Sequence, residues 1–293
     1  MQDKIIRVTG GQGSFRAFIA NSSQTVEEAR RIHHTSPVMT AALGRLLTAA
    51  AMMGLSLENE SGKLTLLVRG DGPAGSLLAT TTALGEVKGY VTHPQVEVPN
   101  KRPGKLDVGR AIGPGSLTVI RDLGEKEPFA GTVELVTGEI AEDLAHYYLQ
   151  SEQTPSALAL GVHVHKDYSV EVAGGFMIQM MPGADDKIAA QLEQRILDLG
   201  PITELLRRGE TPESLAELLF ADLDYTLYDS TPLAYACHCS KDRLASVLVS
   251  LGKEELEKMI AEDHGAEVHC QFCNKNYKFS EADLQNLLIK SSE

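Results

Sequence analysis

The spacing of apolar side chains divides the chain into three parts of different character. From residue 1 to about Pro182, some segments alternate apolar and polar residues, as half-buried strands do. Others repeat apolar residues every three to four positions, as amphipathic helices do. Because strands and helices do not alternate strictly, the pattern favours an α+β fold over a doubly wound parallel sheet. We expect residues 1–182 to form a mixed α/β core domain.

The elements expected in this part follow from those periods and from turn residues between them. Ser36 before Pro37 is typical of a helix start, and Gly70-Asp71-Gly72-Pro73 predicts a turn. The expected helices are Gln24–His33, Pro37–Met53 and Glu139–Gln150. The expected strands are Lys4–Thr9, Ser14–Ala20, Lys63–Arg69, Ser76–Thr82, Glu86–Thr92, Ser116–Arg121, Gly131–Val136, Ala157–His165 and Ser169–Met180.

The middle part, residues 183–236, reads as helical and shows no strand pattern. Glycine and proline interrupt it at several points, and acidic side chains outnumber basic ones by 11 to 4 over residues 185–229. Short, acidic, amphipathic helices of this kind fit either a cap on the core domain or a linker of marginal stability. We predict a helical, marginally stable linker. Its clearest apolar stripe consists of Ile188, Leu192, Ile196 and Leu199.

The last part, residues 237–293, contains all four cysteines of the chain. The sequence reads Cys237-His238-Cys239, then thirty residues, then Cys270-Gln271-Phe272-Cys273. Two close pairs that are well separated suit a tetrahedral metal site, and soft thiolates select zinc over magnesium or calcium. We predict that Cys237, Cys239, Cys270 and Cys273 bind one zinc ion in a small α+β domain. Because this part has few apolar residues, the metal would supply much of its folding energy.

The surroundings of the cysteines predict a compact arrangement of short elements. Ser240 and Ser280 are placed to cap helices. The expected helices run from Ser240 to Leu251, from Lys253 to Glu262 and from Ser280 to Ile289, and the expected strands are Glu267–His269 and Tyr277–Phe279.

The composition limits which binding partners and which cellular compartment we expect for this protein. The net charge of −13, with 5% aromatic residues and no tryptophan, disfavours binding to nucleic acid. The start of the chain lacks the basic-then-apolar pattern of a signal peptide, and the longest apolar run, Ala41–Leu57, is broken by Arg45. We expect a cytoplasmic protein with no membrane partner, where cysteines favour metal binding or redox chemistry over structural disulfides.

Three other interpretations of the cysteine motif are considered. A purely structural zinc ribbon fits the spacing equally well. A nucleic-acid-binding zinc ribbon is disfavoured, because residues 241–293 carry 7 basic and 10 acidic side chains. A thiol-disulfide oxidoreductase would place Cys270 and Cys273 at the start of a helix, whereas a strand-like segment follows them here.

Known catalytic and nucleotide-binding motifs are missing from the sequence. Gly70-Asp71-Gly72-Pro73 lacks the lysine of a phosphate-binding loop, and no Gly-x-Ser-x-Gly motif stands at a strand-to-helix turn. We therefore expect neither an ATP site nor an enzyme.

The cysteine motif, with several other segments, resembles the bacterial redox-regulated 33 kDa heat-shock chaperonin (holdase) family. Together these segments cover nearly the whole chain. They are Ser36–Leu47, Gly70–Pro73, Ser151–Ser156 and Ala173–Phe176.

That resemblance implies a redox-regulated holdase, which keeps unfolding client proteins from aggregating without ATP. The reduced form, with one zinc per chain, would be inactive. Oxidation would form Cys237–Cys239 and Cys270–Cys273 disulfides and release the zinc. The middle helical region would then unfold, expose apolar surface and allow homodimers to form.

Overall fold

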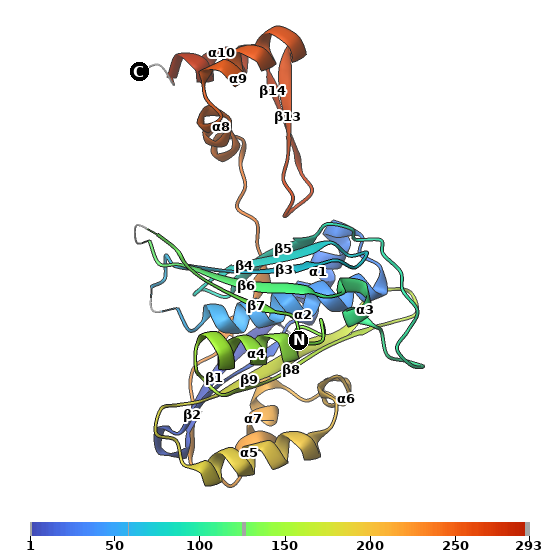
Figure 1. Cartoon of the computed structure of the whole chain (residues 1–293), viewed down its shortest axis with the longest axis vertical. Coiled ribbons are helices and arrows are strands. Elements are labelled where there is room, and N and C mark those ends of the chain that lie inside the picture. Colours follow the sequence, from blue (N-terminus) through green and yellow to red (C-terminus); the bar gives the residue numbers. More distant parts are fainter. Residues whose placement is uncertain (1, 58, 125–126, 291–293) are drawn as a thin grey trace. The chain divides into compact units, whose positions relative to one another are not determined.

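The computed structural model describes residues 2–57, 59–124 and 127–290 of the 293-residue chain. It divides into two compact units, Met1–Ala236 and Cys237–Glu293, called unit 1 and unit 2 below (Figure 1). The structure thus divides once, after Ala236, whereas the sequence predicted a further boundary after Pro182. Both units combine helices with sheets, which confirms the predicted α+β class.

Unit 1 is built around two sheets. Sheet A has the strand order β10-β1-β2-β9-β8 with β11 also beside β1, and sheet B has the order β12-β5-β4-β3-β6-β7. Their neighbouring strands run antiparallel except for β12 and β5. The strands are β1 (Lys4–Gly10), β2 (Phe15–Asn21), β3 (Lys63–Gly70), β4 (Ser76–Thr82), β5 (Glu86–Val91), β6 (Gly115–Asp122), β7 (Phe129–Glu134), β8 (Ser156–Val164), β9 (Val170–Met180), β10 (Tyr225–Leu227), β11 (Thr231–Pro232) and β12 (Ala234–Tyr235).

Helix α2 (Pro37–Gly54) lies between the two sheets and packs against strands of both (Figure 1). By length and composition it could cross a membrane, but 89% of it is buried in unit 1, so it is a core helix. Its small side chains let neighbouring elements approach closely: a Cβ on Gly44 would lie 2.6 Å from Val26. The Ser36 hydroxyl donates to the Val96 carbonyl instead of capping α2.

Three further helices flank α2 or connect strands around it. Helices α1 and α4 match the predicted helices within two residues at each end, whereas the one-turn helix α3 was not predicted because it is too short to show a period. Their bounds are α1 (Ser23–His33), α3 (Val108–Ile112) and α4 (Ala141–Ser151).

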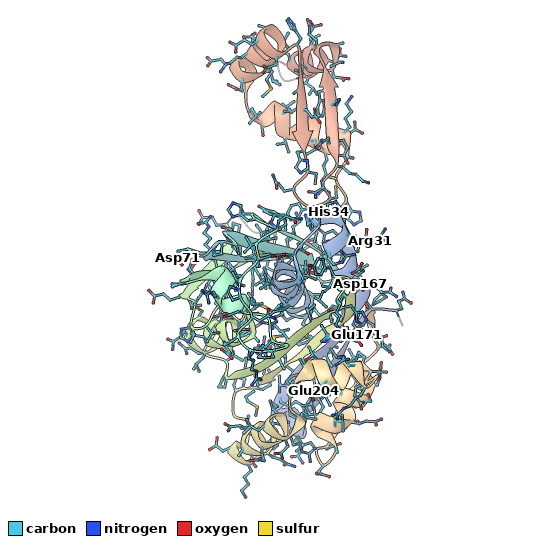
Figure 2. The ribbon with its side chains drawn as sticks, turned by 90° about the vertical axis from the view of Figure 1, so that its right-hand side faces the viewer. Arg31, His34, Asp71, Asp167, Glu171 and Glu204 are labelled. Carbon is cyan, nitrogen blue, oxygen red and sulfur yellow. The ribbon has the colours of Figure 1, made fainter. Side chains whose placement is uncertain are left out.

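The turn between β3 and β4 contains Gly70-Asp71-Gly72-Pro73, as predicted, and Asp71 is labelled in Figure 2. The backbone N–H groups of Asp71 and Gly72 donate to the carbonyls of Pro114 and Ile112 at 2.9 and 2.8 Å. Because these donors already have partners within the protein, the turn offers them to no phosphate.

Residues 183–220 pack onto the face of sheet A that points away from α2 (Figure 1). They form α5 (Asp186–Leu199), α6 (Ile202–Arg207) and α7 (Pro212–Phe220). Phe220 stacks on Phe15 of β2 with 4.8 Å between ring centroids. Burial of such apolar side chains holds the helices to the sheet. The buried members on the helical side are Leu192, Ile202, Leu205, Leu206, Leu215, Ala216, Leu219 and Phe220.

The expectation that residues 183–236 contain no strand is wrong. β10 and β11 pair with β1, and β12 pairs with β5, so the end of this segment contacts both sheets. Strands of two or three residues are too short to show a period, and free edges of existing sheets set them in place. The marginal stability of this segment stays a prediction.

Hydrogen bonds of Tyr235 in β12 hold the last residues of unit 1 to β5 and α1. Its hydroxyl donates to the Gly89 carbonyl at 2.8 Å and lies 3.0 Å from the His33 ring nitrogen Nε2. One residue further, the Ala236 N–H donates to the Val87 carbonyl at 2.9 Å. Ala236, the residue that precedes Cys237, is therefore hydrogen-bonded to sheet B.

Polar groups on the side of unit 1 labelled in Figure 2 form a small ion-pair cluster. The carboxylate of Glu171, near the start of β9, lies 2.8 Å from His163 Nδ1 and 3.0 Å from Arg207 Nε. Arg207 belongs to α6, so this pair adds a polar contact between α6 and sheet A. Ion pairs as exposed as this one contribute little stability.

Unit 2 holds three helices and a hairpin among its described residues. Its buried apolar core is small, with Leu248, Leu256, Phe279 and Leu284 at its centre. The Ser240 and Ser280 hydroxyls accept the N–H of Arg243 and Asp283, which confirms both predicted caps. The elements are α8 (Lys241–Ser250), α9 (Lys253–Lys258) continued by a π-helical turn (Met259–Asp263), β13 (Gly265–His269), β14 (Asn276–Ser280) and α10 (Glu281–Lys290).

One ion pair is largely buried in unit 1. Arg45 of α2 lies 2.8 Å from Glu139, with side chains only 14% and 10% exposed. Burial alone would raise the pKa of Glu139, but the hydrogen bond and charge of Arg45, with help from Lys101, outweigh it and hold the pKa below its ordinary value. Glu139 therefore stabilises the fold as a carboxylate, and the effect is full above the carboxyl pKa of the unfolded chain.

We predict that Glu139→Gln lowers the free energy of unfolding by about 3 kcal/mol at pH 7, because it leaves the Arg45 charge without its carboxylate. Urea unfolding of the full chain measures this. The loss should shrink below about pH 4, where Glu139 of the unfolded wild-type chain takes up a proton while the folded carboxyl, with its lowered pKa, does so only at lower pH. Glu134→Gln, at an exposed position on β7, is the matched control. A loss that is the same at pH 7 and at pH 3 would contradict the prediction.

Candidate metal centre

The first cysteine pair lies on the extended segment just before α8. Cys237 and Cys239 are separated by His238, whose carbonyl accepts a hydrogen bond from Arg243 Nη1 at 3.2 Å. Ser240 then has an extended backbone and caps α8. The cap fixes where the helix begins, and so fixes the backbone immediately after Cys239.

The second pair lies at the tip of the β13–β14 hairpin. The Cys270 N–H donates to the Lys275 carbonyl at 2.9 Å, and the Asn274 N–H donates to the Cys270 carbonyl at 2.9 Å. Asn274 has a φ of 54°, a left-handed conformation that asparagine tolerates better than most residues. This tight turn brings the side chains of Cys270 and Cys273 together and points them toward Cys237 and Cys239.

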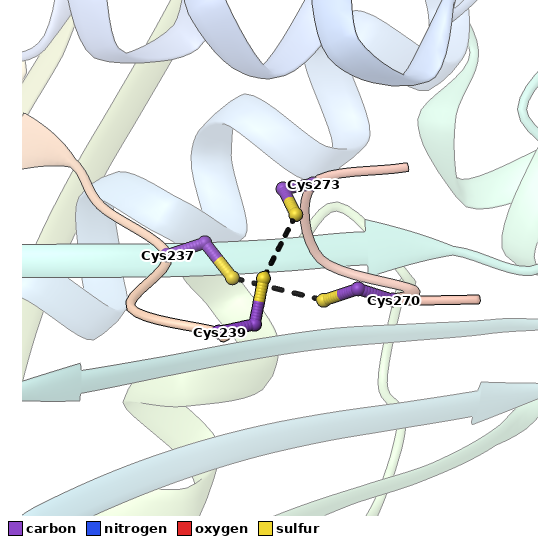
Figure 3. A group of neighbouring side chains, drawn as sticks. All are labelled: Cys237, Cys239, Cys270 and Cys273. Carbon is purple, nitrogen blue, oxygen red and sulfur yellow. Dashed lines mark hydrogen bonds between the residues drawn. The ribbon is translucent and has the colours of Figure 1, made fainter. Parts of the chain in front are cut away.

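The four sulfur atoms converge, although thirty residues separate the two pairs in sequence (Figure 3). All four lie within 4.8 Å of one another, Cys237 and Cys270 at 3.7 Å and Cys239 and Cys273 at 3.2 Å. A tetrahedron with zinc–sulfur bonds of about 2.3 Å has sulfur–sulfur edges of about 3.8 Å. The four thiols are free rather than paired in disulfides. The donor set and its spacing therefore fit a tetrahedral thiolate-binding metal ion.

The acidity of the thiols differs within the cluster. Burial raises the pKa of Cys237. Burial also raises the pKa of Cys239, but hydrogen bonds from the Tyr277 hydroxyl and from neighbouring thiols outweigh it and lower that pKa to about 7. Burial and the hydrogen bond to Cys239 raise the pKa of Cys273 to about 12. Cys239 is thus the most readily ionised of these three thiols, and a bound dication would deprotonate the others as well.

Tyr277 is a neighbour of the centre that the sequence analysis did not single out as functional. Its hydroxyl lies 3.1 Å from Cys239 Sγ and donates to the Cys239 carbonyl at 3.2 Å. The signal available in the sequence was a hydroxyl-bearing aromatic residue four positions after the last cysteine, which reads equally well as an ordinary strand residue.

Two of the nearby histidines have partners other than the sulfur cluster. His269 Nδ1 lies 2.6 Å from Asn276 Oδ1, and His264 Nδ1 lies 3.5 Å from Glu281. The four sulfurs already complete a tetrahedral set, so neither ring is needed as a ligand.

The hairpin bears on the oxidoreductase alternative. Cys270 and Cys273 lie between two antiparallel strands, not at the start of a helix. A catalytic Cys-x-x-Cys draws its reactivity from a helix N-terminus, and this pair has none. The geometry of the site therefore favours metal binding over thiol-disulfide exchange catalysis.

Comparisons with known proteins identify relatives of this chain and of its fold. A family model described as Hsp33 protein matches residues 3–280. Curated proteins named 33 kDa chaperonin from Desulforamulus reducens and Clostridioides difficile are 47% and 48% identical to this chain; they cover 100% and 98% of it, and 99% of each relative is matched.

A solved structure gives the same result in three dimensions. The crystal structure of the 33 kDa chaperonin (heat shock protein 33 homolog) from Thermotoga maritima matches this chain with a TM-score of 0.91 at 37% identity, and the match covers 100% of both chains. The resemblance seen in the sequence is thereby confirmed, and the chain belongs to the Hsp33 family, whose relatives named above are chaperonins.

Proposed function

We propose that this chain is a redox-regulated, ATP-independent holdase that binds unfolded client proteins in the cytoplasm and keeps them from aggregating. The observation that carries the proposal is the convergence of Cys237, Cys239, Cys270 and Cys273 within 4.8 Å in a member of a chaperonin family. These four cysteines sense the oxidant, and binding of client proteins is the activity that they control.

In the reduced state the four cysteines hold one zinc ion per chain as thiolates. Thiolate ligands select zinc, and a bound zinc ion supplies the free energy that joins the segment before α8 to the β13–β14 hairpin. The small apolar core of unit 2 supports this role, because four buried side chains stabilise an isolated module only weakly. The reduced form is inactive as a holdase.

Oxidation by a peroxide converts the ligands into two disulfides, Cys237–Cys239 and Cys270–Cys273. In each pair one thiolate attacks a peroxide oxygen and becomes a sulfenic acid as the other oxygen leaves as water. The second thiol then displaces a second water and closes the disulfide. As each disulfide forms, its two thiols together give two electrons to one peroxide, and the sulfurs no longer ligate the metal.

Loss of the ligands loosens unit 2 and then the segment that leads into it. β10, β11 and β12 are strands of only two or three residues that join residues 225–235 to the sheets of unit 1. Short strands at sheet edges open at a lower free-energy cost than a buried core. Opening releases α5–α7 from sheet A, exposes apolar side chains to clients and allows homodimers to form.

Light scattering from a thermally unfolding client enzyme, without ATP, tests this function. We predict that the chain suppresses scattering after treatment with peroxide at raised temperature, and not when it is reduced and zinc-loaded. The control is the oxidised sample reduced again and reloaded with zinc, which should lose its protective effect. Equal suppression by both forms would leave a chaperone with a structural zinc, and no suppression by either would refute the holdase.

A second prediction concerns the metal. Cys270→Ser should lower the zinc content from about one per chain to near zero after desalting, because a structural zinc site needs all four ligands. Unit 2 of the reduced variant should also lose its protection from proteolysis. Ser250→Ala, which removes a hydroxyl that donates to the Val247 carbonyl at the end of α8, is the control and should keep its zinc. A Cys270→Ser protein that retains one tightly bound zinc would contradict the assignment.

A further inference from the structure

Tyr277 links the hairpin that carries Cys270 and Cys273 to the segment that carries Cys239, through contacts of its hydroxyl group. It lies on β14, opposite Val268 of β13, and thus belongs to the hairpin whose tip carries Cys270 and Cys273. Its hydroxyl reaches across to the other segment, where it contacts both Sγ and the carbonyl oxygen of Cys239, at 3.1 and 3.2 Å. A single side chain therefore positions both the sulfur and the backbone of one candidate ligand.

The rest of the tyrosine is held in place by packing. Tyr277 lies against the apolar core of unit 2, which includes Phe279 and Leu284. Its ring cannot swing away without loss of these contacts, so the hydroxyl is aimed at Cys239 in advance. Side chains that contact a metal ligand from outside in this way orient the ligand and change how strongly it binds.

The hydroxyl has one proton, which can point to the carbonyl oxygen or to the sulfur of Cys239. When the sulfur is a thiolate, only the hydroxyl can donate in the 3.1 Å contact, and this charge-assisted hydrogen bond holds the sulfur at its place in the cluster. It also occupies a sulfur lone pair that would otherwise attack an oxidant. Both effects oppose opening of the site, the first by strengthening ligation and the second by slowing oxidation.

We propose that Tyr277 is a positioning residue that holds Cys239 in the metal centre and sets how much oxidant is needed to open it. This inference rests on the proposed zinc-dependent redox switch and adds to it the residue that adjusts its threshold. Tyr277 touches a ligand and not the metal, so its part is to orient Cys239 and shield it from the oxidant.

The variant that tests the proposal is Tyr277→Phe, which keeps the ring in the core and removes only the hydroxyl. Tyr168→Phe is the matched control, because Tyr168 is an exposed residue between β8 and β9 in unit 1. Zinc affinity is measured by competition with a chelator on the reduced full chain. Zinc release is then followed over a series of peroxide concentrations.

We expect Tyr277→Phe to bind zinc about 10-fold to 100-fold more weakly, the range observed when a partner of a metal ligand is removed. Half of its zinc should also be released at a lower peroxide concentration than in the wild type and in Tyr168→Phe. A Tyr277→Phe protein that matches the wild type in both measurements would overturn the role of Tyr277.

The same experiment separates this inference from the proposed function. A wild-type chain that binds no zinc, or keeps it under peroxide, would refute the switch itself. A wild type that binds and releases zinc, beside an unchanged Tyr277→Phe, would refute only the role of Tyr277. Should the variant fail to fold, NMR of the zinc-loaded wild type decides: a slowly exchanging Tyr277 hydroxyl proton supports the hydrogen bond, and one in fast exchange with water overturns it.

Discussion

The convergence of four cysteine sulfurs within 4.8 Å is the feature of unit 2 on which the proposed function depends. At the centre of its described residues, Leu248, Leu256, Phe279 and Leu284 form the buried apolar core, and three helices and a hairpin surround them. Ordering each residue of a chain costs about 1.5 kcal/mol, so burial of a few leucines and one phenylalanine offsets little of the total. We propose that ligation of a metal by the four thiolates is the interaction that makes this unit stable, so that chemistry that removes the thiolates removes that stability.

Unit 1 is stabilised in a different way and does not depend on the cysteines. Helix α2 is buried between two sheets, and a second apolar cluster joins sheet A to α5–α7. The part of unit 1 that leads directly to Cys237 contains β10, β11 and β12, which span only two or three residues each. In the proposed switch, a change at the cysteines opens residues 183–236 while the core between the sheets stays folded.

Much of this organisation could be predicted from the sequence. Alternating segments such as Ser76–Thr82 are strands with the predicted bounds, and the two serine caps of unit 2 were recognised from residue type and position alone. The cysteine spacing also predicted that the two pairs would converge, because close pairs far apart in sequence have few other uses in a reducing compartment.

Other features depend on tertiary structure and left no periodic signal. The strands β10–β12 exist because sheet edges were available to pair with them. The carboxylate of Asp143 accepts hydrogen bonds from the N–H groups of Val136, Thr137, Gly138 and Ile140. No local sequence pattern predicts this set of bonds. The hydrogen bond of Tyr277 depends on where the hairpin meets the segment before α8. The disulfide pairing of the oxidised form stays a prediction, because the structure contains free thiols.

Hydrogen–deuterium exchange on the full chain, with released zinc measured in the same samples, tests most directly whether thiolate ligation holds unit 2 folded and secures residues 183–236. The reduced protein should protect amides in both segments. Peroxide should release about one zinc per chain, the stoichiometry of a four-thiolate site. Protection should be lost from residues 237–290 and then from residues 183–236, while α2 and the sheet strands around it stay protected. Zinc release with unchanged exchange in both segments would contradict the account.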